Sequence, residues 1–164
     1  MTKYARFVTP LGALFATAAG NALTGLYYEG GRHAPEISRA WVEDCAAQPL
    51  AECVRQLREY LAGKRQAFDL PLAPDGSEFQ RRVWMEIARI PFGETLTYAE
   101  LARRAGAPGA ARAAGAATGR NPHSIIVPCH RVIGTDGSLT GYAGGLGRKT
   151  KLLEIEGVLQ GSLV

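Results

Sequence analysis

The sequence has few of the residues that cross-link a chain or hold a metal. There are three cysteines and three histidines in 164 residues, with no Cys-x-x-Cys pair and no cluster of histidines. Three cysteines cannot all pair within one chain, which favours a reducing compartment over a disulfide framework. We therefore expect no structural metal site. The cysteines are Cys45, Cys53 and Cys129.

Long hydrophobic runs are also missing. No stretch approaches the roughly 18 uninterrupted apolar residues that a membrane-spanning helix needs. The N-terminal residues 1–6 lead into an alternating pattern rather than into the apolar core of a signal peptide. We therefore predict a cytoplasmic protein with no membrane partner.

Positive charge is present, and it is unevenly distributed. The net charge is +4, but residues 1–76 carry eight basic and eight acidic side chains, whereas residues 77–164 carry eleven and seven. Between Glu100 and Lys151 there are eight basic residues and two acidic ones. Such an excess is typical of proteins that bind a polyanion, although a solvated charged surface would give the same count.

The first half predicts a small α/β domain. Residues 4–8, 14–18 and 23–28 have strand composition and are separated by turns at 9–12 and 20–21. Residues 29–48 predict a loop with a short helix around Trp41, and residues 50–61 have the apolar spacing of a helix. Cys53 lies beside that apolar stripe, so packing is its expected role.

Residues 67–74 predict a linker because prolines and a glycine follow one another closely. The domain boundary is therefore placed near residue 75, which gives domains 1–75 and 76–164. Ser77 to Gln80 has the pattern of a capping box, and Thr97 to Glu100 repeats it, so each predicts a helix start. Core packing is the expected role of Trp84.

Two short helices are predicted near residues 98–105 and 110–118, joined by a glycine-containing turn, as in a helix-turn-helix. The second helix carries almost only small side chains, and Arg112 is its one long side chain. It has too few polar side chains to read base edges in the major groove, so shape-based or minor-groove contact is favoured. Close packing against a neighbouring helix remains the alternative. Its small residues include Ala110, Ala111, Ala113 and Gly115.

The segment Ile125 to Val132 carries the most reactive side chain of the chain. β-branched residues stop at Pro128, which predicts a strand end, and Cys129 is followed directly by His130 and Arg131. A neighbouring cation favours the nucleophilic thiolate of a cysteine. A strand with an unreactive buried cysteine is the alternative.

The second half resembles the O6-alkylguanine-DNA alkyltransferases, the methylated-DNA–protein-cysteine methyltransferases that repair alkylated bases directly. The resemblance rests on the signature Pro128-Cys129-His130-Arg131-Val132. It implies an RNase H-like α/β N-terminal domain, with a small antiparallel sheet and a helix, before a mostly α C-terminal domain with a winged-helix-like helix-turn-helix. Further matching segments are Phe79-x-x-x-Val83-Trp84, Ile90-Pro91-x-Gly93, Thr97-Tyr98-x-x-Leu101-Ala102, Ala111-Arg112-Ala113, Arg120-Asn121-Pro122, Tyr142-Ala143-Gly144-Gly145-Leu146 and Glu156-Gly157.

The resemblance also implies roles for individual residues. Cys129 would take the alkyl group from guanine O6, His130 would act as its base through a bridging water, and Glu156 would orient His130. Asn121 would hold the turn that carries the cysteine, and Tyr98 would help to stabilise the departing guanine. Further substrate contacts are implied for Val132, Tyr142, Ala143 and Ser124.

The implied partner is double-stranded DNA with an alkylated guanine, contacted in the minor groove by a monomer. Whether O4-alkylthymine is also a substrate and whether molecules assemble cooperatively stay open. The lesion must be flipped out of the duplex, and Arg112 would fill the vacated place. Each molecule would act once, without a cofactor. The implied DNA contacts are Arg112, Ala110, Ala111, Ala113, Gly115, Arg120 and Arg131.

Three other functions compete with this one. A damage-recognition protein of the same fold would lack the nucleophile, which Cys129 supplies here. A Cys-His hydrolase needs its base to face the nucleophile directly, and adjacent side chains in an extended segment point to opposite faces. A sequence-specific regulator would need a richer recognition helix.

Overall fold

The computed structural model describes residues 1–160, and these form two compact units. The first unit comprises residues 1–75 together with Pro122–Ile126, and the second comprises Gly76–Asn121 and residues 127–160. Among residues 1–160, no helix combines the length and the apolar character that crossing a bilayer requires.

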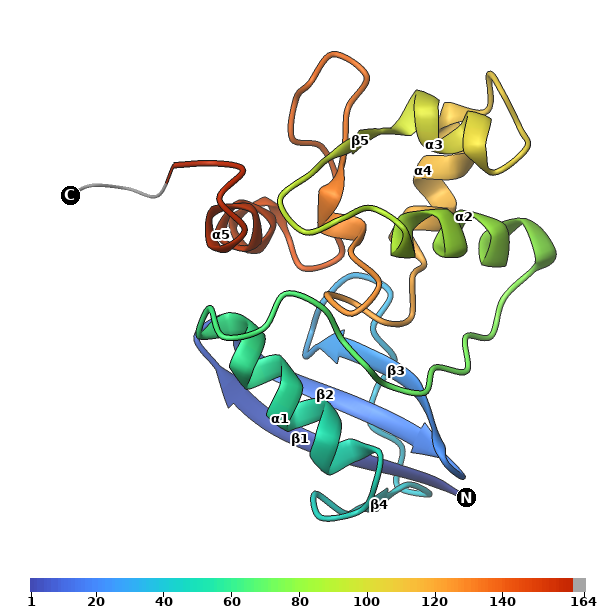
Figure 1. The fold of residues 1–164 in the computed structure, drawn as a ribbon. Helices are drawn as coiled ribbons and strands as arrows, with labels where there is room; N and C mark the ends of the chain where they lie inside the picture. Colours follow the sequence, from blue (N-terminus) through green and yellow to red (C-terminus); the bar gives the residue numbers. More distant parts are fainter. Residues whose placement is uncertain (161–164) are drawn as a thin grey trace. The chain divides into compact units, whose positions relative to one another are not determined.

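The first unit is a four-stranded sheet with one helix against it (Figure 1). The strand order is β3-β2-β1-β4, in which β1, β2 and β3 are antiparallel neighbours and β4 is parallel to β1. The helix α1 contacts β1 and β2. The elements are β1 (Thr2–Thr9), β2 (Gly12–Ala19), β3 (Ala22–Tyr28), β4 (Val42–Glu43) and α1 (Leu50–Leu61).

Alternation in the sequence produces this sheet. Ala5 and Phe7 of β1 are buried while Arg6 and Val8 between and beside them are exposed, as a strand with one covered face requires. The predicted strands and the helix over 50–61 are confirmed, and Cys53 is fully buried in the α1 stripe. The predicted helix around Trp41 is wrong, because turns there lead directly into the short strand β4.

The outer edge of β3 is closed by two segments from distant parts of the chain. Leu72 of the linker forms a parallel bridge with Leu23, and His123 forms one with Leu26. The residues around His123 therefore extend the sheet of the first unit, although the chain on either side of them belongs to the second.

The second unit is mostly helical and contains one short parallel strand pair (Figure 1). Helices α3 and α4, joined by a turn over 105–110, form the predicted helix-turn-helix, and both contact α2. The pairing of β5 with β6 was not predicted, because two residues per strand leave no alternating pattern to detect. The elements are α2 (Glu78–Ala88), β5 (Leu96–Thr97), α3 (Tyr98–Arg104), α4 (Ala111–Gly119), a 3₁₀ turn η1 (Cys129–Arg131), β6 (Val132–Ile133) and α5 (Leu146–Ile155).

The helix starts follow the side-chain caps. Ser77 and Gln80 form both halves of a capping box at α2. At α3 only half of the predicted box forms: the Thr97 hydroxyl accepts from the Glu100 amide, while the Glu100 carboxylate binds Arg103 and Arg104 instead. Trp84 is buried as predicted, and its Nε1 also donates to the Ala117 carbonyl over 2.8 Å, which ties α2 to α4.

Candidate active site

Cys129 opens the 3₁₀ turn η1, which leads into β6, and is not itself part of a strand. The Cys129 amide donates to the Val127 carbonyl over 2.7 Å, and the Arg131 amide donates to Pro128 over 2.9 Å. The predicted strand end is therefore wrong: its β-branched residues form tight turns, and Ile125 has a φ of 70°. Side chains in a 3₁₀ turn diverge by about a third of a revolution, so the opposite-face argument about Cys129 and His130 does not apply.

His130, Arg131 and Glu156 form a buried polar cluster. His130 Nε2 lies 2.8 Å from Glu156 Oε2, and Arg131 donates Nε to Oε1 over 2.8 Å and an Nη to Oε2 over 2.9 Å. Another Arg131 nitrogen donates to the Ile90 carbonyl. Burial lowers the pKa of His130, while Glu156 opposes that shift. His130 is therefore neutral near pH 7.

The neutral His130 has a defined tautomer. Because the Glu156 carboxylate can only accept, Nε2 carries the proton, and Nδ1 is left with a lone pair. Nδ1 is buried and has no hydrogen-bond partner. A buried acceptor without a partner is costly, and such atoms concentrate where chemistry occurs.

Arg131 lies in the interior. Only 7% of its surface is exposed, and its guanidinium is engaged by Glu156 and the Ile90 carbonyl. The expected DNA contact of Arg131 stays a prediction, and making it would require breaking a buried ion pair to reach a phosphate. Sequence alone could not separate this arginine from those on the surface.

The Cys129 thiol is buried, with 4% of the residue exposed. Burial raises its pKa, and a hydrogen bond with Asn121, the positive charge of Lys149 and backbone amides act in the opposite direction. The expected activation by adjacent cations therefore needs correction, because His130 is neutral and Arg131 is neutralised by Glu156. Asn121 also donates Nδ2 to the Val127 carbonyl over 2.9 Å, so one amide fixes both the turn and the thiol.

Lys149 of α5 is a functional candidate that the sequence prediction missed. Its side chain is fully buried, and Nζ donates to the carbonyls of Val132, Thr140 and Gly141 at 2.5, 2.9 and 3.3 Å. Burial lowers the pKa of Lys149 to about 8, against an opposing effect of Cys129. Its i+3, i+4 and i+7 spacing to Leu152, Leu153 and Glu156 places it on the inner face of α5, a signal the sequence does contain.

Tyr98 begins α3 and is close enough to Cys129 for the charge of that residue to affect its pKa. Burial raises the pKa of Tyr98, the charge of Cys129 raises it further, and a hydrogen bond with the Thr140 side chain lowers it. A Cβ on Gly115 of α4 would lie 3.7 Å from the Tyr98 ring, so the backbone of α4 at Gly115 lies close to this aromatic side chain.

The remaining predicted substrate residues fall into two groups. The His130 and Tyr142 rings meet edge-on at 6.4 Å, and Ala143 follows in the same half-buried loop. The Val132 carbonyl accepts from Lys149. Ser124 belongs to the first unit, where its amide donates to the Leu26 carbonyl over 3.1 Å.

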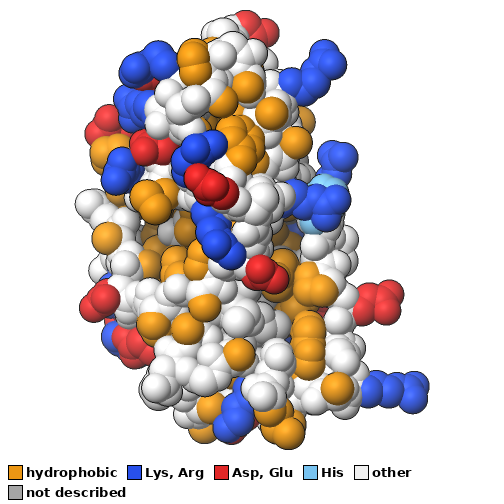
Figure 2. Space-filling view, turned by 90° about the vertical axis from the view of Figure 1, so that its right-hand side faces the viewer, with side chains coloured by type: hydrophobic (Ala, Val, Ile, Leu, Met, Phe, Trp, Pro, Cys, Tyr) orange, Lys and Arg blue, Asp and Glu red, His pale blue; other side chains and the backbone are white. Residues whose placement is uncertain are grey.

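The predicted DNA contacts on α4 differ in exposure. Arg112, Ala113 and Arg120 are exposed, whereas Ala110, Ala111 and Gly115 are half-buried. On the face drawn in Figure 2, lysine and arginine side chains alternate with acidic and hydrophobic ones. Part of the basic excess is also internally paired, as Arg103 and Arg104 are with Glu100. The basic excess between Glu100 and Lys151 therefore overstates the unpaired positive charge in this part of the chain.

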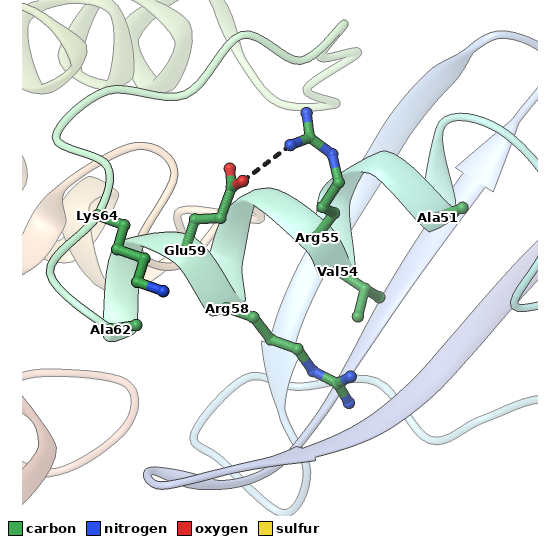
Figure 3. A pocket seen from close by; sticks show the side chains of 7 residues that line it. All are labelled: Ala51, Val54, Arg55, Arg58, Glu59, Ala62 and Lys64. Atoms are coloured by element: carbon green, nitrogen blue, oxygen red, sulfur yellow. Dashed lines mark hydrogen bonds and ion pairs between the residues drawn. The ribbon is translucent and has the colours of Figure 1, made fainter.

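A concave region lies along α1 of the first unit, with a volume of about 470 Å³ (Figure 3). Arg55 pairs with Glu59 there, while Arg58 points away from that pair. It holds no nucleophile. Within residues 1–160 no three His, Cys, Asp or Glu side chains are grouped as metal ligands. The groove is lined by Ala51, Val54, Arg55, Arg58, Glu59, Ala62 and Lys64.

Comparison with known families and structures accounts for both units. Residues 78–158 match the family model of the 6-O-methylguanine DNA methyltransferase DNA-binding domain, and residues 2–74 match that of its ribonuclease-like domain. The methylated-DNA–protein-cysteine methyltransferase of Methanosarcina acetivorans is 46% identical over 94% of this chain and 97% of its own. That of Mycolicibacterium paratuberculosis is 47% identical over 95% and 93%.

Solved structures agree with the sequence comparison. The crystal structure of Mycobacterium tuberculosis OGT in complex with DNA superposes with a TM-score of 0.87 at 45% identity, covering 94% of this chain and 92% of that one. The O6-methylguanine methyltransferase of the same organism superposes with a TM-score of 0.85 at 47% identity, covering 95% and 93%. This chain therefore belongs to the methylated-DNA–protein-cysteine methyltransferase family, whose members repair O6-alkylated guanine directly by transferring the alkyl group to a cysteine.

Proposed function

We propose that Cys129 is the cysteine that accepts the alkyl group. The observation that carries this proposal is the surroundings of its sulfur: a buried thiol contacted by Asn121, subject to the positive charge of Lys149 and next in sequence to the neutral His130, which is held by the Glu156 carboxylate. The sulfur attacks the methyl carbon, an S–C bond forms as the C–O6 bond breaks, and the electron pair of that bond leaves with guanine. This exchange needs no cofactor.

The thiol must lose its proton before or during the attack. Nε2 of His130 donates to Glu156, so Nδ1 is the nitrogen that can accept a proton, directly or through one bridging water. Once protonated, the imidazolium would be stabilised by the Glu156 carboxylate, which also binds Arg131. The resting thiol can thus stay protonated, because its base lies in the same buried cluster.

The guanine is proposed to bind among Tyr98, Val132 and the loop with Tyr142 and Ala143. Tyr98 donates to the leaving purine, and the carbonyls of Cys129 and Val132 accept from its exocyclic amine. Support comes from the electrostatic effect of the sulfur on Tyr98, which requires that they lie near each other.

Double-stranded DNA is the proposed partner, bound through the minor groove by the helix-turn-helix. The small side chains of α4 permit its backbone to approach the DNA closely. The exposed Arg112 has the length to occupy the space of a flipped-out base. Contacts are proposed for Ala110, Ala111, Ala113, Gly115 and Arg120. Residues 76–164 then form the DNA-binding and transfer domain, and residues 1–75 form the N-terminal domain.

The thioether product has no ready leaving group, so each molecule acts once, as a monomer. The three free cysteines fit the reducing cytoplasm, which we propose as its location.

The direct test uses duplex DNA that carries a labelled methyl group on guanine O6. One equivalent of label should move to the protein, and Cys129→Ser should abolish that transfer. Cys53→Ser is the matched control, because Cys53 is equally buried but desolvation raises its thiol pKa to about 12 without an opposing charge. Transfer that survives Cys129→Ser would refute the assignment.

A further inference from the structure

The five residues Pro122–Ile126 leave the second unit and join the first, and Cys129 follows three residues after them. The residues on either side, Asn121 and Val127, belong to the second unit and are hydrogen-bonded to each other over 2.9 Å. The segment is therefore a loop whose two ends are joined by a hydrogen bond in the second unit. Its middle residues belong to the first unit, and Cys129 lies just after its C-terminal end.

The anchor consists of backbone and side-chain bonds to β3. The Leu26 amide donates to the Pro122 carbonyl over 2.8 Å, and the Ser124 amide donates to the Leu26 carbonyl over 3.1 Å. Between them, His123 Nε2 lies 2.8 Å from the Leu23 carbonyl. That carbonyl also accepts from the Ala73 amide over 2.8 Å. One oxygen of β3 thus holds both the interdomain linker and the segment that precedes Cys129.

The chemistry of His123 is defined by this contact. The Leu23 oxygen can only accept, so Nε2 must carry the proton. The side chain is 1% exposed, and burial lowers the pKa of His123, which keeps the ring neutral. The imidazole is a side-chain anchor between the Pro122–Ile126 segment and β3, added to the backbone bonds that an apolar residue at this position would also allow.

The backbone after His123 explains why an anchor is needed. Ile125 is buried and has a φ of 70°, a left-handed conformation that β-branched residues rarely adopt. Such a conformation persists only where the surroundings hold it. A segment released from β3 could relax at Ile125 and move the turn that begins at Cys129.

We propose that His123 is a positioning residue for alkyl transfer: its imidazole clamps the Pro122–Ile126 segment to the Leu23 carbonyl and so holds Cys129 in its reactive position. This inference rests on the proposed role of Cys129. It concerns the rate of transfer rather than the affinity for DNA, since the imidazole is buried away from any nucleic acid contact.

Two substitutions of His123 distinguish the effect of its hydrogen bond from the effect of its side-chain volume. His123→Leu fills the space without a donor, whereas His123→Gln retains an N–H donor of similar reach. His33→Gln is the matched control, because it makes the same exchange at an exposed histidine of the first unit. For each variant we would measure the rate of single-turnover transfer from methylated duplex DNA at saturating protein. The Kd for unmethylated duplex DNA and the melting temperature of the protein are measured in parallel.

We expect His123→Leu to slow transfer at saturation about tenfold or more while its Kd for DNA stays within about twofold, and His123→Gln to recover most of the rate. Equal rates for His123→Leu and the wild type would overturn the proposal, as would equal loss in both variants. Absence of transfer in the wild type would instead refute the role of Cys129, which keeps the two failures distinct.

The wild-type protein offers a test that does not depend on the folding of a variant. Nitrogen NMR should show His123 as the neutral Nε2–H tautomer, with a ring proton that exchanges slowly with solvent. An Nδ1–H tautomer or a rapidly exchanging Nε2 proton would overturn the proposal.

Discussion

His130 Nε2 lies 2.8 Å from Glu156 Oε2, and both side chains have no exposed surface. The same carboxylate binds the guanidinium of Arg131. One acidic side chain thus orients the proposed base and neutralises a buried cation. A substitution at Glu156 therefore affects both roles at once.

Replacing this carboxylate should affect both folding and reactivity. Glu156→Gln leaves Arg131 without its counter-ion, and breaking a buried pair costs roughly 3–5 kcal/mol of the free energy of unfolding. Transfer should slow about a hundredfold. Denaturant unfolding and single-turnover kinetics check these values. Glu154→Gln, on the same helix but only half-buried, is the control. Wild-type kinetics in Glu156→Gln would contradict the proposed role of Glu156.

Lys149→Met should slow transfer about tenfold or more, because it removes the cation that opposes the rise in the Cys129 pKa. It also leaves three carbonyls without their donor, at a cost of about 1–3 kcal/mol in the free energy of unfolding for each one left buried and unpaired. The thiol pKa, followed by the absorbance of the thiolate, should increase. Lys151→Met changes an exposed lysine of the same helix and should leave both quantities unchanged.

Stability should decrease in mild acid. Burial lowers the pKa of both His123 and His130 in the folded state, so the unfolded chain binds protons first as the pH falls below about 6.5. The stability they contribute is complete above that pH and is lost as the pH falls through their folded-state pKa values. Melting temperatures between pH 7.5 and 5 test this. His123→Gln should show a shallower dependence than the wild type.

Arg112→Ala should slow the repair of duplex DNA about tenfold or more while leaving the reaction with a free alkylated base within about twofold. The difference arises because only the duplex must be opened. Arg112→Lys retains the positive charge but not the planar guanidinium. It therefore distinguishes attraction to the phosphates from occupation of the space left by the flipped base. Equal losses on duplex and free base in Arg112→Ala would show that Arg112 is not a flipping wedge.

The parts of the fold that the sequence predicted are those with local signals. Alternation of Ala5 and Phe7 with exposed neighbours located β1, and the Ser77 cap located the start of α2. Trp41 and Ile125 misled the prediction. Trp41 precedes a strand that exists only through pairing with β1, and the β-branched run at Ile125 is held in turns by tertiary contacts.

In the site, too, the sequence predicted the features that have a local signal and missed those that depend on tertiary contacts. The motif around Cys129 identified the family, but the inward position of Arg131 and the anchoring of His123 to β3 depend on contacts between residues 25 to 100 positions apart. Lys149 was overlooked because lysine is rarely buried, although its spacing to Leu152 and Leu153 pointed inward.

The most direct measurement is a peptide mass spectrum after the protein has reacted with an excess of duplex DNA containing O6-methylguanine. The account predicts one added methyl group, located on Cys129, and a quantity of repaired guanine equal to the quantity of protein. An unmodified Cys129 beside repaired DNA, or repair that continues beyond one lesion per molecule, would contradict it.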